Sequence, residues 1–127
     1  MTNPLLPPHP HTLPQAIARV EGFYAQGTTP NRPQRNHNPG DIEFGVFAIF
    51  HGATGTDGRF AVFPDDETGF QCLQSLLSGP HYRMLTVKEC IDKYAPPNEN
   101  DDVNYVALVC EWTGLQPTDI VGMKLEC

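Results

Sequence analysis

One acidic residue stands out by its surroundings. Glu21 lies in the segment RVEGF, with Phe23 and Tyr24 close behind it, near the end of the first predicted helix. An apolar setting and the negative end of a helix dipole both disfavour an ionised carboxylate and raise its pKa. A carboxylic acid that keeps its proton near neutral pH can act as a general acid. Glu21 is therefore a candidate proton donor, and the alternative is a surface glutamate in solvent.

A polar loop, QRNHNPGDIEFG, follows at residues 34–45. Asn36 and Asn38 tolerate left-handed backbone angles and bond to nearby amides, so we expect them mainly to build the loop. After a Pro-Gly corner the loop presents Asp41, with Glu43 two positions further along. Either carboxylate could position a water molecule or stabilise positive charge, and the alternative is a solvated acid at a strand end. His37 is left open between building the loop and facing a ligand.

The elements that must position these residues begin with a helix. Apolar residues recur at spacings of three and four from Leu13 onward, so we predict a helix that Thr12 caps and Gly27 ends. Residues 28–40 contain three prolines and no large apolar side chain, which predicts an irregular connector. Glu21 and the polar loop would then be joined by a segment without regular structure.

A small hairpin and three helices are predicted after the loop. The runs 41–50 and 59–64 are rich in β-prone residues, and Asp57-Gly58 between them is typical of a tight turn. The helices are expected at 65–79, 86–97 and 101–114.

The last two of these helices carry specific signals. Thr86 and Glu89 form a capping box, and the final helix has apolar residues around most of its circumference, Val103 included, so we expect it to be buried. The order of elements predicts an α+β domain that is mainly helical.

Length and composition restrict the function classes. The 127 residues fit one domain, residues 13–127, preceded by a Pro-rich extended segment, residues 1–12. That segment lacks the basic and apolar regions of a secretory signal, so we expect no signal peptide, and no run approaches the roughly 20 apolar residues of a membrane span. A net charge of −7 argues against nucleic acid as a partner.

Cysteine and histidine positions do not predict a metal site. The four cysteines are too far apart in sequence for the CxxC knuckles of zinc sites, and they are Cys72, Cys90, Cys110 and Cys127. We expect buried free thiols, with two disulfides as the alternative. His9 and His11 are expected in a solvated tail rather than around a metal. No metal and no cofactor is predicted.

Four strings taken together resemble the lysozyme superfamily, in particular a phage and bacterial group of lysozyme-like muramidases and transglycosylases. RVEGF resembles that group's helix with a Glu-Gly pair, and RNHNPGDIEFG is similar to its Arg-Asn-Asn-Asn-Pro-Gly-Asp/Asn motif, with His37 where an asparagine is common. FAVFPDDETGFQCL and KYAPPNENDDVNYV look like its later motifs. The resemblance spans residues 16–115 in the expected order and implies a lysozyme-like fold with a small β-hairpin after the first long helix.

The resemblance also implies an activity. It indicates a peptidoglycan-cleaving glycosidase, an endolysin-like antimicrobial muramidase, that hydrolyses the β-1,4 bond between N-acetylmuramic acid and N-acetylglucosamine at the bacterial cell wall. Glu21 would be the general acid and Asp41 the second carboxylate. One alternative is a lytic transglycosylase, which forms 1,6-anhydro products and needs no second carboxylate. Another is an inactive lysozyme-like module that binds glycan or protein, which the charge of −7 favours.

A glycan groove needs aromatic faces and hydrogen-bonding groups. The candidates for binding peptidoglycan strands are Asn38, Glu43, Phe44, Phe63, Tyr94, Asn100 and Tyr105. Each aromatic could instead belong to the core, and Asn100 with Asp101 could instead cap the last helix. We expect a monomer.

Overall fold

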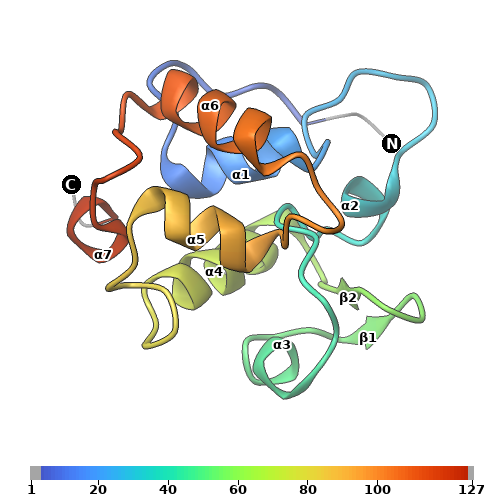
Figure 1. The fold of residues 1–127 in the computed structure, drawn as a ribbon. Coiled ribbons are helices and arrows are strands. Elements are labelled where there is room, and N and C mark those ends of the chain that lie inside the picture. The colour runs from blue at the N-terminus through green and yellow to red at the C-terminus, as the bar shows by residue number, and fades with distance from the viewer. Residues whose placement is uncertain (1–3, 126–127) are drawn as a thin grey trace.

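The computed structural model describes residues 4–125, which form seven helices and one two-stranded antiparallel sheet (Figure 1). The elements are α1 (Leu13–Val20), α2 (Arg32–Arg35), α3 (Val46–Phe50), β1 (Gly55–Thr56), β2 (Ala61–Val62), α4 (Asp66–Leu77), α5 (Val87–Tyr94), α6 (Asp102–Thr113) and α7 (Val121–Lys124). The prediction of a mainly helical α+β chain is confirmed at this level. In Figure 1, α1, α4, α5 and α6 stack together, whereas α3 and the hairpin lie apart at the lower end.

The first helix starts as predicted and ends earlier. The Thr12 hydroxyl accepts a hydrogen bond from the Gln15 backbone N–H at 3.2 Å, and the Gln15 side chain accepts one from the Thr12 N–H at 2.9 Å. The predicted end at Gly27 is wrong, because the helix stops one residue before Glu21, which is its C-cap. Gly22 follows with a φ of +95°, a left-handed conformation that glycine adopts without steric cost. Glu21 therefore lies at the helix terminus.

The predicted connector, residues 28–40, contains the short helix α2. Asn31 caps it by accepting from the Gln34 backbone N–H at 3.2 Å, and the Gln34 side chain accepts from the Asn31 N–H at 3.0 Å. Pro33 lies in the first turn, where its missing N–H costs no helical hydrogen bond. A wholly irregular connector was therefore the wrong interpretation of these prolines.

The predicted hairpin exists, but its first strand was misplaced. The expected strand at 41–50 is wrong: most of its apolar part forms α3, and Glu43 contributes an isolated bridge to Phe60. β1 lies instead in the segment expected to be the linker and pairs with β2. The turn at Asp57-Gly58 is confirmed, since the Asp57 carboxylate accepts from the Phe60 N–H at 2.8 Å and Gly58 has a φ of +118°.

The helix α3 forms because Ala48 packs against a small core. A short apolar run satisfies helix and strand patterns equally, so packing decides between them. Ala48 is buried and packs in a small core with Ala61, Phe63 and Cys72. This second core attaches α3 and the hairpin to α4.

The helices after the hairpin follow the prediction closely. α4, α5 and α6 are present, and the capping box of α5 is formed, with Thr86 accepting from the Glu89 N–H at 3.1 Å. The expected burial of Val103 is wrong, because that side chain is 86% exposed, and α6 instead buries Tyr105 and Val109. The short helix α7 was not predicted.

The main core joins α1, α4, α5, α6 and α7. Its largest buried side chains include Ile17, Leu73, Leu77, Ile91 and Val109. The N-terminal segment has no helix from residue 4 to residue 12 and is partly packed.

The structure corrects the prediction for His11 and shows the state of three cysteines. The expectation that His11 is solvated is wrong: it is buried, and its backbone N–H donates to the Trp112 carbonyl at 2.8 Å. Cys72 and Cys90 are buried and, like Cys110, free, whereas the fourth cysteine, at position 127, lies outside the described residues. None of the helices described between residues 4 and 125 is long and apolar enough to cross a bilayer.

Candidate active site

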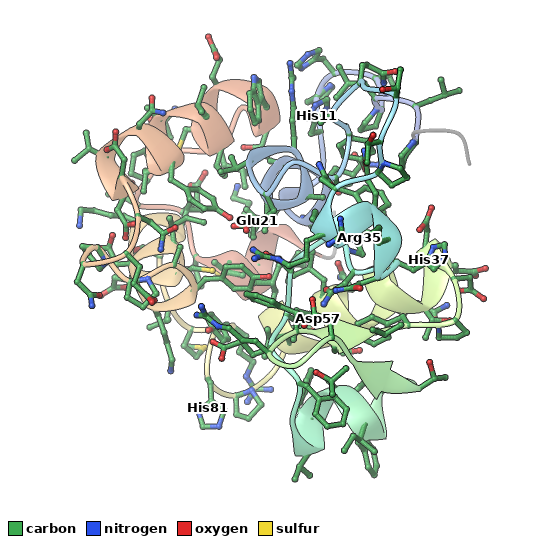
Figure 2. All side chains as sticks on the ribbon, turned by 90° about the vertical axis from the view of Figure 1, so that its right-hand side faces the viewer. His11, Glu21, Arg35, His37, Asp57 and His81 are labelled. Carbon is green, nitrogen blue, oxygen red and sulfur yellow. The ribbon has the colours of Figure 1, made fainter. Side chains whose placement is uncertain are left out.

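Glu21 lies where the end of α1 meets α6. The Tyr105 hydroxyl donates a hydrogen bond to Glu21 Oε2 at 2.9 Å, which joins residues 84 positions apart. Tyr105 is itself buried in the main core, so its hydroxyl is held in place. Figure 2 shows Glu21 just below α1 in the middle of the molecule, while His37 and His81 lie toward the periphery. The carboxyl group is thus partly enclosed and positioned by a fixed donor.

The surroundings of Glu21 raise its pKa above the ordinary value. Burial is the largest cause, and the negative charge of Asp41 adds to it, whereas the Tyr105 hydrogen bond and the positive charge of Arg32 lower the pKa. Removal from water disfavours the ionised form more than these two groups stabilise it. The upward direction agrees with the sequence prediction, although the main causes are burial and a neighbouring acid.

Asp41 is held in an ion pair. It has a φ of +52°, and its backbone N–H donates to the Asn38 carbonyl at 3.0 Å to close the loop corner. The Asp41 side chain is 4% exposed, and Arg32 Nε donates to its two carboxylate oxygens at 3.0 and 3.1 Å, with a further bond from Arg32 Nη2. A bidentate guanidinium pair of this kind is strong and geometrically specific. The Asp41 carboxylate is therefore bound to Arg32 of α2 and is not free in the cleft.

A cleft of about 540 Å³ opens beside Glu21. It lies between the hairpin with its preceding loop on one side and α5 with the segment after it on the other. Its lining includes Glu21, Arg32, Asp41, Glu43, Arg59, Phe60, Tyr82, Lys93, Tyr94, Glu99 and Asn100. The two acids predicted as a pair, and three of the predicted substrate-binding residues, thus share one cavity.

A larger cavity, of about 1080 Å³, lies elsewhere and is lined by α4, the start of α1 and the C-terminal segment. Size alone would favour it as the active site. Its lining includes His11, Tyr24, Glu67 and Lys124. We assign the candidate active site to the smaller cleft, because a carboxyl group with a raised pKa opens into it.

Tyr94 fixes the corner of the polar loop. Its hydroxyl donates to the Gly40 carbonyl, and its ring packs edge-on against Tyr82 with centroids 6.3 Å apart. A Cβ atom on Gly40 would lie 2.5 Å from the Tyr94 hydroxyl and 2.9 Å from Leu73, so a residue with a side chain does not fit. The close approach of α5 to the loop explains why glycine occupies this position, directly before Asp41.

Arginine side chains form much of one wall. The guanidinium of Arg32 lies 3.9 Å from the centroid of the Phe60 ring, and that of Arg59 lies 4.9 Å from it. Arg59 also pairs with Glu43 at 3.5 Å and with Glu99 at 3.8 Å. Since Glu99 belongs to the segment before α6, Arg59 connects the hairpin to the opposite side of the cleft. These exposed pairs contribute little to stability.

The remaining sequence candidates differ in exposure and in their position relative to Glu21. Tyr105 and Asn100 line a shallow depression of about 230 Å³ that also reaches Glu21. Asn38 and Phe63 are fully buried, so the structure removes both from the substrate-binding candidates. Phe44 is 38% exposed and is not among the residues that line the cleft.

Several loop residues serve the backbone. The Asn38 amide donates to the Ile42 and Ala61 carbonyls at 2.9 Å each, so it builds the loop. The Asn36 amide donates to Asp57 at 3.0 Å, and this bond helps to lower the pKa of Asp57 to about 2. His37 Nδ1 lies 2.8 Å from an Asp66 oxygen, which directs the ring to the start of α4 and away from Glu21.

Sequence reasoning missed the cationic and some of the aromatic residues of the cleft, namely Arg32, Arg59, Phe60, Tyr82 and Lys93. A signal existed for the first of these, because Arg32 lies two residues before the loop and a nearly buried acid needs a counter-ion. The others had no local signal. Between residues 4 and 125 no cluster of three or more His, Cys, Asp or Glu side chains could hold a metal ion.

Searches against protein-family models, curated proteins and solved structures find no match to this chain. The site is therefore interpreted from its own chemistry and from the motifs of the sequence.

Proposed function

We propose that the protein is a lysozyme-like glycosidase that hydrolyses the β-1,4 bond between N-acetylmuramic acid and N-acetylglucosamine, with Glu21 as general acid. The observation that carries this proposal is a partly buried carboxyl group with a raised pKa at the edge of an open cleft. The substrate class rests on the motif resemblance. The site of action is then the bacterial cell wall, and the partner is a peptidoglycan strand.

The residues around Glu21 suit both states of a general acid. Burial and the charge of Asp41 raise the pKa of Glu21 and so favour the protonated form that a general acid needs. When the proton moves to the departing oxygen, the new carboxylate is stabilised by the Tyr105 hydroxyl and by the charge of Arg32. Glu21 can then take a proton from the attacking group, so one residue serves both steps.

A lysozyme-like fold is part of this proposal. The order of elements supports it: a helix that ends at the acid, a polar loop, a hairpin and a set of helices. The cleft between the hairpin and the helical part is the place where this class of fold would bind an extended glycan.

The ion pair of Asp41 favours a second candidate function. A carboxylate that activates water must be free to accept its proton, and Asp41 is nearly buried and bound to Arg32. A lytic transglycosylase needs no such group, because the 6-hydroxyl of the substrate attacks and closes a 1,6-anhydro ring. In that reaction Asp41 would fix the loop and help to keep Glu21 protonated.

Clearing of purified peptidoglycan tests the proposal. Wild-type protein should reduce the turbidity, and Glu21→Gln should slow clearing by roughly 10²–10⁴-fold, because an amide keeps the shape and cannot supply the proton. Glu111→Gln, on the exposed side of α6, is the matched control and should clear normally. A folded Glu21→Gln protein that clears at the wild-type rate would overturn the assignment.

Mass spectrometry of the digest separates the two reactions. Hydrolysis gives products with reducing muramyl ends, whereas transglycosylation gives products lighter by one water with 1,6-anhydro ends. The anhydro products would replace the hydrolase proposal by the second candidate while leaving the role of Glu21 in place.

A further inference from the structure

An exposed apolar surface lies on α3 and the residue pair before it. This α3 surface consists of Phe44, Val46, Phe47, Ile49 and Phe50. It holds five of the ten exposed large hydrophobic residues within the described range 4–125, and Val46 and Phe50 are 84% and 85% exposed. Monomers rarely expose contiguous apolar patches larger than a few hundred Å², and the largest patch on a monomer often has a function.

The geometry of α3 concentrates these side chains on its outer face. Ala48 points into the small core, while Val46, Ile49 and Phe50 stand at positions i, i+3 and i+4 on the exposed side. Figure 1 shows α3 at the lower end of the molecule, apart from α1, α5 and α6. The surface therefore lies at one end of the molecule and forms an apolar tip.

Charge is absent from the whole segment. Residues 44–56 contain no Asp, Glu, Lys or Arg, although the chain as a whole carries a net charge of −7. The nearest charged positions are Glu43 and Asp57 at its two ends. Recognition at this tip must therefore be apolar, and a ligand bound through ion pairs does not fit it.

We propose that the α3 surface inserts into the interfacial region of a lipid bilayer. A stable homodimer buries about 800 Å² on each partner. The five side chains of the α3 surface offer a smaller apolar area, because Phe44 and Phe47 are only 38% exposed. If a fully exposed aromatic side chain can bury roughly 200 Å², the whole surface can bury on the order of 500 Å². A helix of five residues also presents little more than one turn to a protein groove.

A bilayer sets no minimum area, because interfacial binding grows continuously with the apolar area that is inserted. The Phe47 ring stacks on His51 with centroids 4.1 Å apart, which places a polar ring beside the apolar tip, as suits the boundary between lipid and water. The net charge of −7 opposes anionic headgroups, so the preferred surface is a neutral one.

Co-sedimentation with phosphatidylcholine vesicles tests this proposal. Wild-type protein should bind, and Phe50→Asp and Val46→Asp should each lower the partition coefficient about tenfold or more, since each places a charge where an apolar side chain would enter lipid. Phe50→Ser should weaken binding without adding charge. Val103→Asp is the matched control, because Val103 is equally exposed but isolated on α6, and its binding should equal that of the wild type.

Several results would overturn the proposal. These are wild-type protein that stays in the supernatant, and Phe50→Asp protein that binds as well as the wild type. Light scattering that shows a dimer lost in Phe50→Asp, without vesicle binding, would assign the surface to a second copy instead. Replacing part of the lipid by phosphatidylglycerol should reduce binding at low salt, and stronger binding would contradict the apolar mechanism.

This inference is independent of the proposed glycosidase activity. Phe50 does not line the cleft, so Phe50→Asp should clear purified peptidoglycan, which contains no lipid bilayer, at the wild-type rate. Circular dichroism checks that each variant is folded.

Discussion

Removal of the Tyr105 hydroxyl should widen the pH range of the proposed activity. In Tyr105→Phe the ring remains in the core, and the change removes the bond from the hydroxyl to Glu21 Oε2 at 2.9 Å. That bond stabilises the ionised carboxylate and lowers the pKa of Glu21. Without it the proton is held more tightly, and the acid stays in its active form to a higher pH.

The size of the effect follows from the kind of bond. Hydrogen bonds to charged groups contribute about 1.5–3 kcal/mol, and the lower end applies here because Glu21 is partly open to the cleft. A change of 1.36 kcal/mol corresponds to one pH unit in a titration. The basic limb of the pH profile of kcat/KM should therefore move upward by about one pH unit.

The assay is the initial rate of peptidoglycan clearing as a function of pH, with the basic limb reporting the acid in the free enzyme. Tyr24→Phe is the matched control, because Tyr24 lies in the other cavity and its own pKa of about 12 is far from the range tested. A basic limb that stays in place, or that moves to lower pH in Tyr105→Phe, would refute the argument that this hydroxyl stabilises ionised Glu21.

Two further predictions concern stability. Gly40→Ala should lower the free energy of unfolding by about 1–3 kcal/mol and reduce activity, because the new Cβ atom would lie 2.5 Å from the Tyr94 hydroxyl. Thermal denaturation measures the stability and peptidoglycan clearing measures the activity, and an unchanged melting temperature would contradict the close approach. Asp102 is buried, and burial, a hydrogen bond shared with Asp92 and the negative charge of Asp92 raise its pKa. Its contribution to stability is therefore favourable below the ordinary value of 3.8 and is lost as the pH rises through the raised value. Asp102→Asn should therefore raise the melting temperature at pH 7 by a few degrees and change it little at pH 3, and equal effects at both pH values would count against this account.

Local signals explain the successful predictions of the fold. Thr12 and Thr86 cap their helices, and Asp57 closes its turn, through hydrogen bonds to backbone groups two or three residues away. Such bonds need no partner from elsewhere in the chain, so the sequence alone indicates them. The run at 41–50 contained no comparable signal, and β propensity led to the wrong element.

The candidate site shows the same division. Glu21 and the polar loop could be found from the sequence, because an acid beside aromatic residues and a Pro-Gly corner are local patterns. The ion pair between Asp41 and Arg32 could not be predicted, since the position of Arg32 depends on a short helix inside a proline-rich connector. Burial of Asn38 and Phe63 likewise follows from packing between segments that are distant in sequence.

The sequence by itself determined the mainly helical class, the caps and the turn, and it singled out Glu21, because these depend on neighbouring residues. The tertiary structure decided which groups surround that acid: Tyr105 from 84 positions away, and Asp41 held by Arg32. It also decided that Ala48 packs inward and leaves the apolar side chains of α3 exposed. The physical reason is that a pKa and a buried face are set by everything within a few ångströms in space, and a linear pattern does not specify those distances.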